Sequence, residues 1–200
     1  LVAIGVLSGA KLAEWQAKKM GISPAIVADY ITYVVVAGFI GAYFLNALFY
    51  QPEIWLEILR QPSLFFKRYL GLSSYGGFIG VVVGSLVWRW RRELPILPVA
   101  DAVAFAFPLG WFFGRMGCFV VHDHPGAVTD FFLAVDNYRV GQPPYMPRHD
   151  LGLYEVFWSA ATLGFFFWLS RKPRPRGVYV ALLPALYTPI RFVLDFLRAP

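Results

Sequence analysis

Long apolar stretches alternate with short polar ones along the chain, and this pattern predicts helices that cross a membrane. A helix needs about 20 predominantly apolar residues to cross the ~30 Å hydrocarbon layer of a bilayer. The apolar stretches that approach or exceed this length are residues 1–15, 26–50, 75–90, 96–121, 151–169 and 178–197. We therefore expect an all-α, polytopic integral membrane bundle in which residues 1–200 form one transmembrane domain.

Two segments between these stretches have a different character. Residues 52–70 mix tryptophan, leucine and phenylalanine with glutamate, arginine and lysine, a pattern typical of a helix that lies on the membrane surface. Residues 122–150 form the longest polar stretch and are rich in proline and glycine, so we expect them to fold into a small cap. Because the chain begins without methionine inside an apolar stretch, we expect further residues at both ends of the full protein.

Composition and charge agree with a membrane protein and set its orientation. Of all residues, 58% are hydrophobic and only 15% are charged, which excludes an ordinary soluble domain. The net charge of +6 does not indicate nucleic-acid binding, because the basic residues gather at helix ends. If the six segments alternate, Lys18, Lys19 and the basic residues of 89–92 and 171–176 share one side. The positive-inside rule makes that side cytoplasmic, so residues 122–150 would face outward.

Two arginines lie inside stretches that otherwise predict membrane-buried helix. Arg115 belongs to residues 96–121 and Arg191 to residues 178–197. A cation at the bilayer centre costs at least ~2.5–3.5 kcal/mol on insertion scales, so it is rarely kept without a partner or a function. The guanidinium group also matches phosphate well, because its planar fork donates two parallel hydrogen bonds. We expect both arginines to approach one cavity near the outer leaflet and to hold a lipid phosphate there.

Other polar residues of the apolar stretches are candidates for counter-ions or for helix packing. Tyr187, Arg191 and Asp195 recur every fourth residue and so share one helix face, where Asp195 can neutralise Arg191. Glu155 follows Tyr154 near the start of residues 151–169 and is a further counter-ion. Gly76, Gly80 and Gly84 form a face of small residues, which is typical of close helix packing; a helix N-terminus there could also bind phosphate.

The polar stretch contains residues that could bind a metal ion. His122, Asp123, His124 and His149 include a His-x-His pair and a distant third histidine. Two closely spaced histidines in a polar loop are more often hydrogen-bonded structure, so we expect no metal and no cofactor. The single cysteine, Cys118, excludes an intramolecular disulfide. It could act as a nucleophile beside Arg115, but a small apolar filler is the commoner role.

Five short motifs, in order from the third apolar stretch to the end of the chain, resemble the bacterial prolipoprotein diacylglyceryl transferase family. Residues 74–80 (SYGGFIG) resemble its His-Gly-Gly-Leu-x-Gly segment, and residues 114–119 (GRMGCF) resemble its Gly-Arg-x-Gly-Asn-Phe signature. Residues 147–155 are similar to its Pro-Arg-His-Pro-x-Gln-Leu-Tyr-Glu segment, and residues 171–177 to its basic loop. Residues 191–198 are similar to its Arg-Phe-x-x-Glu-Phe-x-Arg helix. The family has a longer N-terminus and a further C-terminal span, which fits a truncated chain.

The resemblance implies a reaction, its partners and a site. The family transfers the diacylglyceryl group of phosphatidylglycerol to the lipobox cysteine of a preprolipoprotein signal peptide in the bacterial inner membrane, and it releases glycerol phosphate. On this chain the resemblance implies that Arg115, Arg191 and Tyr75 take part in catalysis near the outer leaflet. The residues expected to bind substrate are Gly76, Gly77, Asp123, His149, Tyr154, Glu155, Tyr187 and Asp195.

Several positions depart from the family pattern. The histidine of the Gly-Gly segment is Tyr75 here, the signature asparagine is Cys118, and the glutamate downstream falls on Asp123. A phenol stays protonated at neutral pH and accepts protons poorly. Either Tyr75 is activated or only positions substrate by hydrogen bonding, or one of the three histidines is the base. The alternative function is a non-catalytic membrane protein of the same fold that binds anionic phospholipid or lipoprotein signal peptides.

Overall fold

The computed structural model describes residues 1–50, 71–136 and 146–198. The described helices are α1 (Val2–Lys19), α2 (Pro24–Tyr50), α5 (Ser74–Arg92), α6 (Ile96–Val121), α7 (Leu151–Leu169) and α8 (Val178–Phe196). The described strands are β1 (Pro125–Val128), β2 (Val135–Asp136) and β3 (Pro147–Asp150). The chain divides into two compact units, one of Leu1–Pro24 with Leu97–Pro200 and one of Ala25–Ile96.

The helices follow the apolar stretches of the sequence closely. Helices α6 and α7 have the bounds expected from the sequence. Helix α1 was expected to end at residue 15 and continues to Lys19. Among the described residues, three helices are long and apolar enough to cross a membrane: α2, α6 and α8. The helical membrane class is thus confirmed, and the expectation of six crossings stays a prediction. The expected surface helix of residues 52–70 lies outside the described residues.

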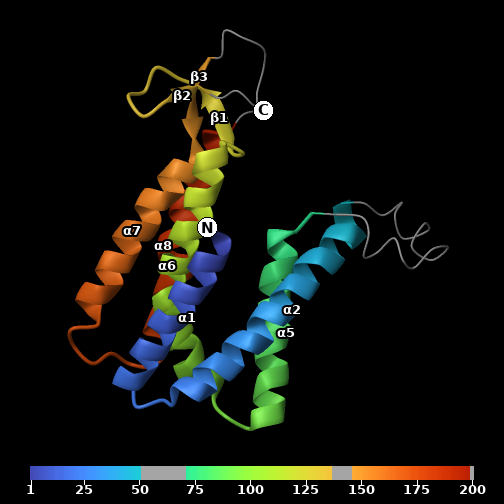
Figure 1. The fold of residues 1–200 in the computed structure, drawn as a ribbon, viewed down its shortest axis with the longest axis vertical. Helices are drawn as coiled ribbons and strands as arrows, with labels where there is room; N and C mark the ends of the chain where they lie inside the picture. The colour runs from blue at the N-terminus through green and yellow to red at the C-terminus, as the bar shows by residue number, and fades with distance from the viewer. Residues whose placement is uncertain (51–70, 137–145, 199–200) are drawn as a thin grey trace, which may run out of the picture. The chain divides into compact units, whose positions relative to one another are not determined.

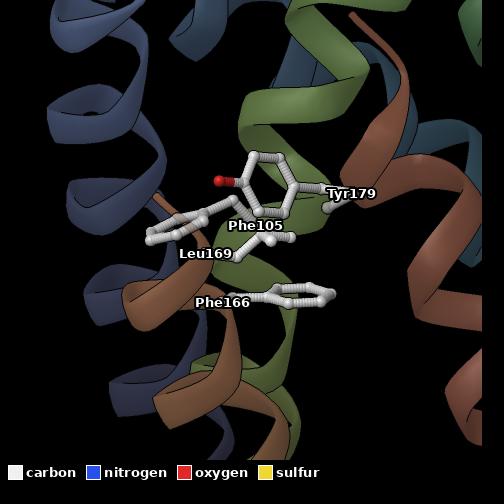
Figure 2. Close-up of a cluster of buried hydrophobic side chains, with 5 residues drawn as sticks. Phe105, Phe166, Leu169 and Tyr179 are labelled. Carbon is white, nitrogen blue, oxygen red and sulfur yellow. The ribbon is translucent and has the colours of Figure 1, made fainter. Parts of the chain in front are cut away.

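In the first unit, α1, α6, α7 and α8 run alongside one another (Figure 1). Figure 2 shows part of its core, where Phe105 of α6, Phe166 of α7 and Tyr179 of α8 meet. The rings of Phe105 and Phe166 both meet the Tyr179 ring edge to face, with centroids 5.1 Å apart in each pair. Aromatic pairs favour this geometry because the positive ring edge meets the negative face. These contacts fix α6, α7 and α8 as one body.

A buried aspartate fastens the start of α8 to α6. Asp101 is only 1% exposed, and its Oδ1 accepts hydrogen bonds from the backbone N–H groups of Tyr179, at 2.7 Å, and Val180, at 3.0 Å. The first N–H groups of a helix have no partner within the helix, so an acceptor from another element can satisfy them. The N-cap of α8, Gly177, has φ +93° and supplies no side chain for this purpose. Asp101 therefore has a structural role, because it satisfies the first N–H groups of α8.

Four basic residues of the first unit gather near Asp101, at the basic end of the unit. Lys19 of α1 and Arg171, Lys172 and Arg174 of the α7–α8 connection line one cavity of about 320 Å³ together with Asp101. From Asp101 to Arg115 the helix α6 advances by about 21 Å at its rise of ~1.5 Å per residue. Within this unit, the basic end and Arg115 are thus well separated along the helix axis.

A small antiparallel sheet follows α6, with strand order β1-β3-β2. Val128 of β1 and Val135 of β2 both pair with Arg148 of β3. The sequence predicted a structured cap here without predicting strands. Gly126 allows the close packing of β1, because a Cβ at this position would lie 2.6 Å from the carbonyl oxygen of Leu197 and 2.7 Å from the Cβ of His149. Strand β1 thus contacts both β3 and the end of α8.

In the second unit, α2 and α5 pack through small residues. A Cβ on Gly41 would lie 2.9 Å from the Cα of Gly80, and a Cβ on Gly76 would lie 2.9 Å from the Cα of Ala42. The close helix packing expected for the glycine face of residues 76–84 is therefore present. Polar contacts add to it: both oxygens of Asp29 accept from Arg92, at 2.7 and 2.9 Å, and Oδ2 also accepts from the indole N–H of Trp88 at 2.8 Å.

We expect Gly80→Val to lower the melting temperature of the detergent-solubilised full-length protein by several degrees. Its Cβ would overlap the backbone of Ala37 and Gly38, with atoms at 2.9 Å, and overpacking of this kind costs about 1–3 kcal/mol. Gly77→Ala is the matched control, because the nearest atom to its Cβ lies at 3.8 Å. A Gly80→Val protein that melts with the wild type would show that α2 and α5 do not approach so closely.

Candidate active site

A single buried carboxylate, that of Glu155, is the centre of the site. The side chain of Asp150 accepts from the N–H of Leu153 at 3.1 Å and so starts α7, which turns Glu155 into the interior, where it is 1% exposed. Its Oε2 accepts from the indole N–H of Trp111 at 2.9 Å and from the hydroxyl of Tyr187 at 3.3 Å. Donors from α6 and α8 thus converge on one group of α7.

Both arginines singled out in the sequence contact this carboxylate. Arg115 Nε lies 2.8 Å from Glu155 Oε2, and Arg191 Nη1 lies 3.3 Å from Glu155 Oε1. The two guanidinium groups come from α6 and α8, 76 positions apart in the sequence, and are held to opposite oxygens of one group. The structure therefore brings them together, as the sequence led us to expect.

Each arginine has a second source of support. The guanidinium of Arg115 lies 4.7 Å from the ring centroid of Trp111, a cation–π contact that gains strength away from water. Arg191 Nη2 lies 2.9 Å from Asp195 Oδ1, one helical turn further along α8. Because a buried charge without a partner costs several kcal/mol, these contacts explain how the apolar helices tolerate the arginines. Arg115 is 15% exposed and Arg191 is 32% exposed at the side chain.

Both arginines have hydrogen-bond donors beyond those that contact Glu155 and Asp195. A guanidinium has five N–H donors and no acceptor. Arg115 donates through Nε to Glu155 and through Nη1 to His124, while Arg191 contacts Glu155 and Asp195 through Nη1 and Nη2. These contacts use two N–H groups of each arginine. Two neighbouring guanidinium groups with further donors form a geometry suited to a phosphate.

The end of α6 leads directly into this site. His122 adopts φ +49°, and this left-handed residue ends the helix. Its Nδ1 lies 2.7 Å from Oδ2 of the fully buried Asp150, so the end of α6 is tied to the start of α7. His122 therefore has a structural contact, and the two residues that follow it, Asp123 and His124, turn back toward Arg115.

Cys118, Asp123 and His124 form a tight cluster. The Cys118 sulfur, a carboxylate oxygen of Asp123 and a ring nitrogen of His124 all lie within 4.8 Å of one another. The cluster differs from the metal site considered in the sequence, because it includes Cys118 and neither His122 nor His149. Arg115 Nη1 lies 3.3 Å from His124 Nε2, and its positive charge opposes the binding of a cation at this place. The contacts thus favour a proton-transfer role over a metal site.

His149 and Tyr154, which the sequence placed among the substrate-binding residues, contact each other. His149 Nδ1 lies 2.6 Å from the Tyr154 hydroxyl, and the ring of Phe131 lies 5.9 Å from that of His149. The pair joins β3 to the first turn of α7. Its role in substrate binding stays a prediction.

Tyr75, Gly76 and Gly77 belong to the second unit. They form the first turn of α5, where the Ser73 hydroxyl accepts from the N–H of Gly76 at 3.3 Å. Tyr75 is 76% exposed, and close packing against α2 accounts for Gly76. The expectation that Tyr75 takes part in catalysis together with the arginines stays a prediction.

Sequence reasoning missed Trp111 and the central place of Glu155. The sequence did carry a signal for Trp111, because it lies four residues before Arg115 and therefore on the same face of α6. Glu155 was expected as one of several counter-ions. That it would serve both arginines could not be read from the sequence, because three helices must pack before their side chains meet.

Comparison with known proteins places this chain in a family. The sequence profile of the prolipoprotein diacylglyceryl transferase family matches residues 1–200. Three similar proteins are each named phosphatidylglycerol–prolipoprotein diacylglyceryl transferase. That of Mannheimia succiniciproducens is 34% identical, with 97% of this chain and 73% of the relative aligned. That of Chromohalobacter salexigens is 30% identical, with 98% and 72% aligned. That of Janthinobacterium sp. is 32% identical, with 87% and 65% aligned.

The match extends over the whole chain, which itself spans about two thirds to three quarters of the length of these relatives. It confirms the resemblance that the five motifs indicated. The chain belongs to the prolipoprotein diacylglyceryl transferase family.

Proposed function

We propose that this protein transfers the diacylglyceryl group of phosphatidylglycerol to the lipobox cysteine of a preprolipoprotein signal peptide. The cysteine sulfur attacks the glycerol carbon that carries the phosphate, the carbon–oxygen bond breaks, and glycerol phosphate leaves. The product is a thioether. The observation that carries this proposal is the pair of arginines on α6 and α8 joined by the buried Glu155.

The two arginines fit the phosphate of the lipid. Charge on the departing phosphate oxygen grows as the carbon–oxygen bond breaks, and preorganised donors stabilise such developing charge most when water is excluded. Glu155 and Asp195 hold the guanidinium groups in place before substrate binds, so little reorganisation is needed during the reaction. In this role Arg115 and Arg191 clamp phosphate, and Glu155, Tyr187 and Asp195 orient them.

The charge pattern supports a site toward the outer leaflet of the bacterial inner membrane. In the first unit, the basic end near Lys19 and Arg174 lies about 21 Å along α6 from Arg115. The positive-inside rule assigns that basic end to the cytoplasm. The arginine pair then lies toward the opposite leaflet, where a translocated signal peptide presents its cysteine.

A transfer assay tests the proposal. The full-length protein in detergent micelles containing phosphatidylglycerol is mixed with a synthetic lipobox peptide, and mass spectrometry follows the gain of one diacylglyceryl group. We expect a thioether product and release of glycerol phosphate. Complementation of a strain depleted of its own transferase is the matching test in cells. A folded protein that binds phosphatidylglycerol but forms no product would favour the non-catalytic lipid-binding alternative.

A further inference from the structure

The proposed reaction needs a group that accepts the proton of the substrate thiol. The chain contains three histidines, and imidazole is the side chain best suited to accept a proton near neutral pH. All three histidines lie in the described residues, at the end of α6 and in β3. Their contacts differ, and the differences decide which of them can act.

Two of the histidines make contacts that join elements of the scaffold. His122 Nδ1 lies 2.7 Å from Asp150, which also caps α7. His149 Nδ1 lies 2.6 Å from the Tyr154 hydroxyl. These contacts join α6 and β3 to α7, and they explain both residues as parts of the scaffold.

His124 lies between a carboxylate and the arginine proposed to hold phosphate. Its Nδ1 lies 2.5 Å from Asp123 Oδ1, and its Nε2 lies 3.3 Å from Arg115 Nη1. A guanidinium can only donate, so Nε2 must accept in this contact. The proton of the neutral ring is then on Nδ1, where it is donated to Asp123. The two partners therefore set the tautomer that has its lone pair on Nε2, facing the phosphate clamp.

We propose that His124 accepts the thiol proton of the lipobox cysteine and that Asp123 orients its ring; this inference rests on the proposed function. The carbon under attack is bonded to a phosphate oxygen, so the sulfur must approach close to the phosphate held by Arg115. When Arg115 Nη1 turns from His124 Nε2 to the bound phosphate, it frees the Nε2 lone pair, and the proton moves from sulfur to Nε2 as the sulfur–carbon bond forms. The carbon–oxygen electron pair leaves with glycerol phosphate, and the imidazolium, stabilised by Asp123, then releases its proton to water.

Cys118 lies close to this pair but is not suited to be the nucleophile. Its sulfur belongs to the cluster with Asp123 and His124. If it attacked the lipid, the product would be a diacylglyceryl thioether on the enzyme. A thioether is a poor leaving group, and the diacylglyceryl group could not pass on to the peptide. The substrate thiol therefore needs its own proton acceptor, and His124 is the histidine that lies beside Arg115.

His124→Gln in the full-length protein tests the proposal in the same transfer assay. With the cysteine peptide at pH 7, we expect the rate to fall about 100-fold, the low end of the contribution of a general base. A base becomes unnecessary when the nucleophile is already ionised. The variant should therefore recover most of the wild-type rate at pH 9, above the ~8.5 pKa of a free thiol, and with a selenocysteine peptide at pH 7. Asp123→Asn should show a smaller loss with the same recovery.

His122→Gln is the matched control and should keep the wild-type pH profile if it melts normally. Among the described residues, the charged and titratable groups that face His124 are Asp123, Arg115 and Cys118, with Glu155 beyond Arg115. A His124→Gln loss that persists at pH 9 and with selenocysteine would overturn the proposal, as would an unchanged rate at pH 7. Stoichiometric zinc in the purified protein would also overturn it, because a metal would occupy Nε2. A wild type inactive under every condition would instead contradict the proposed function.

Discussion

Replacing Arg115 with lysine is expected to lower diacylglyceryl transfer about 10²–10³-fold, the effect of losing one preorganised donor to developing charge. Lysine keeps the positive charge, but it cannot donate two parallel hydrogen bonds to phosphate while also contacting Glu155. Arg191→Lys should also lower the rate sharply. The measurement is the initial rate of transfer to the lipobox peptide, with phosphatidylglycerol binding measured separately.

The control for these two variants is Arg171→Lys, in the exposed basic connection between α7 and α8. It makes the same chemical change outside the site and should leave the rate unchanged. If Arg115→Lys retained full activity, a point charge would suffice at this place. The clamp of paired hydrogen bonds would then be the wrong account of the site.

Glu155→Ala is expected to cause the largest loss of stability. The carboxylate is 1% exposed and contacts both arginines. Removing one partner of a buried ion pair costs about 3–5 kcal/mol, because the remaining charge is left uncompensated. The measurement is the melting temperature and monodispersity of the full-length protein in detergent. Asp195→Asn is the comparison, because Asp195 is 53% exposed and an exposed pair contributes only about 0–1 kcal/mol.

A double variant separates stability from function at Glu155. Replacing a buried ion pair by apolar side chains of similar size is often neutral or stabilising. Glu155→Met combined with Arg115→Met should therefore melt well above Glu155→Ala and yet remain inactive. An active double variant would show that Arg115 is not needed to hold phosphate. A double variant as unstable as Glu155→Ala would show that the loss came from the other groups that contact Glu155, which are Arg191, Trp111 and Tyr187.

The helical membrane class and the helix bounds could be predicted because both depend on local sequence. The ~30 Å hydrocarbon layer sets how long an apolar stretch must be, so residues 96–121 and 151–169 gave α6 and α7 directly. The pairing of Arg191 with Asp195 is also local, since residues four apart share a helix face. The packing of Gly76 and Gly80 against α2 follows from the same spacing rule.

The strands of the cap are less local, and the sequence did not predict them. β1 and β3 pair across 20 to 25 positions, and neither has the alternating apolar pattern that marks a half-buried strand. Asp101 is a similar case. In the sequence it is an unexplained charge in an apolar helix. In the structure it accepts from two N–H groups at the start of α8, which lies beside it.

The sequence by itself determined the family, the helices and the residue types of the site, because motifs and hydrophobic length are properties of single segments. Only the tertiary structure decided which groups meet. Arg115, Glu155 and Arg191 lie on three helices, and packing of α6, α7 and α8 makes one carboxylate serve two guanidinium groups. The sequence left open which of the three histidines is the base, and their partners distinguish them. Asp150 and Tyr154 hold two of them, whereas Asp123 and Arg115 set the tautomer of His124.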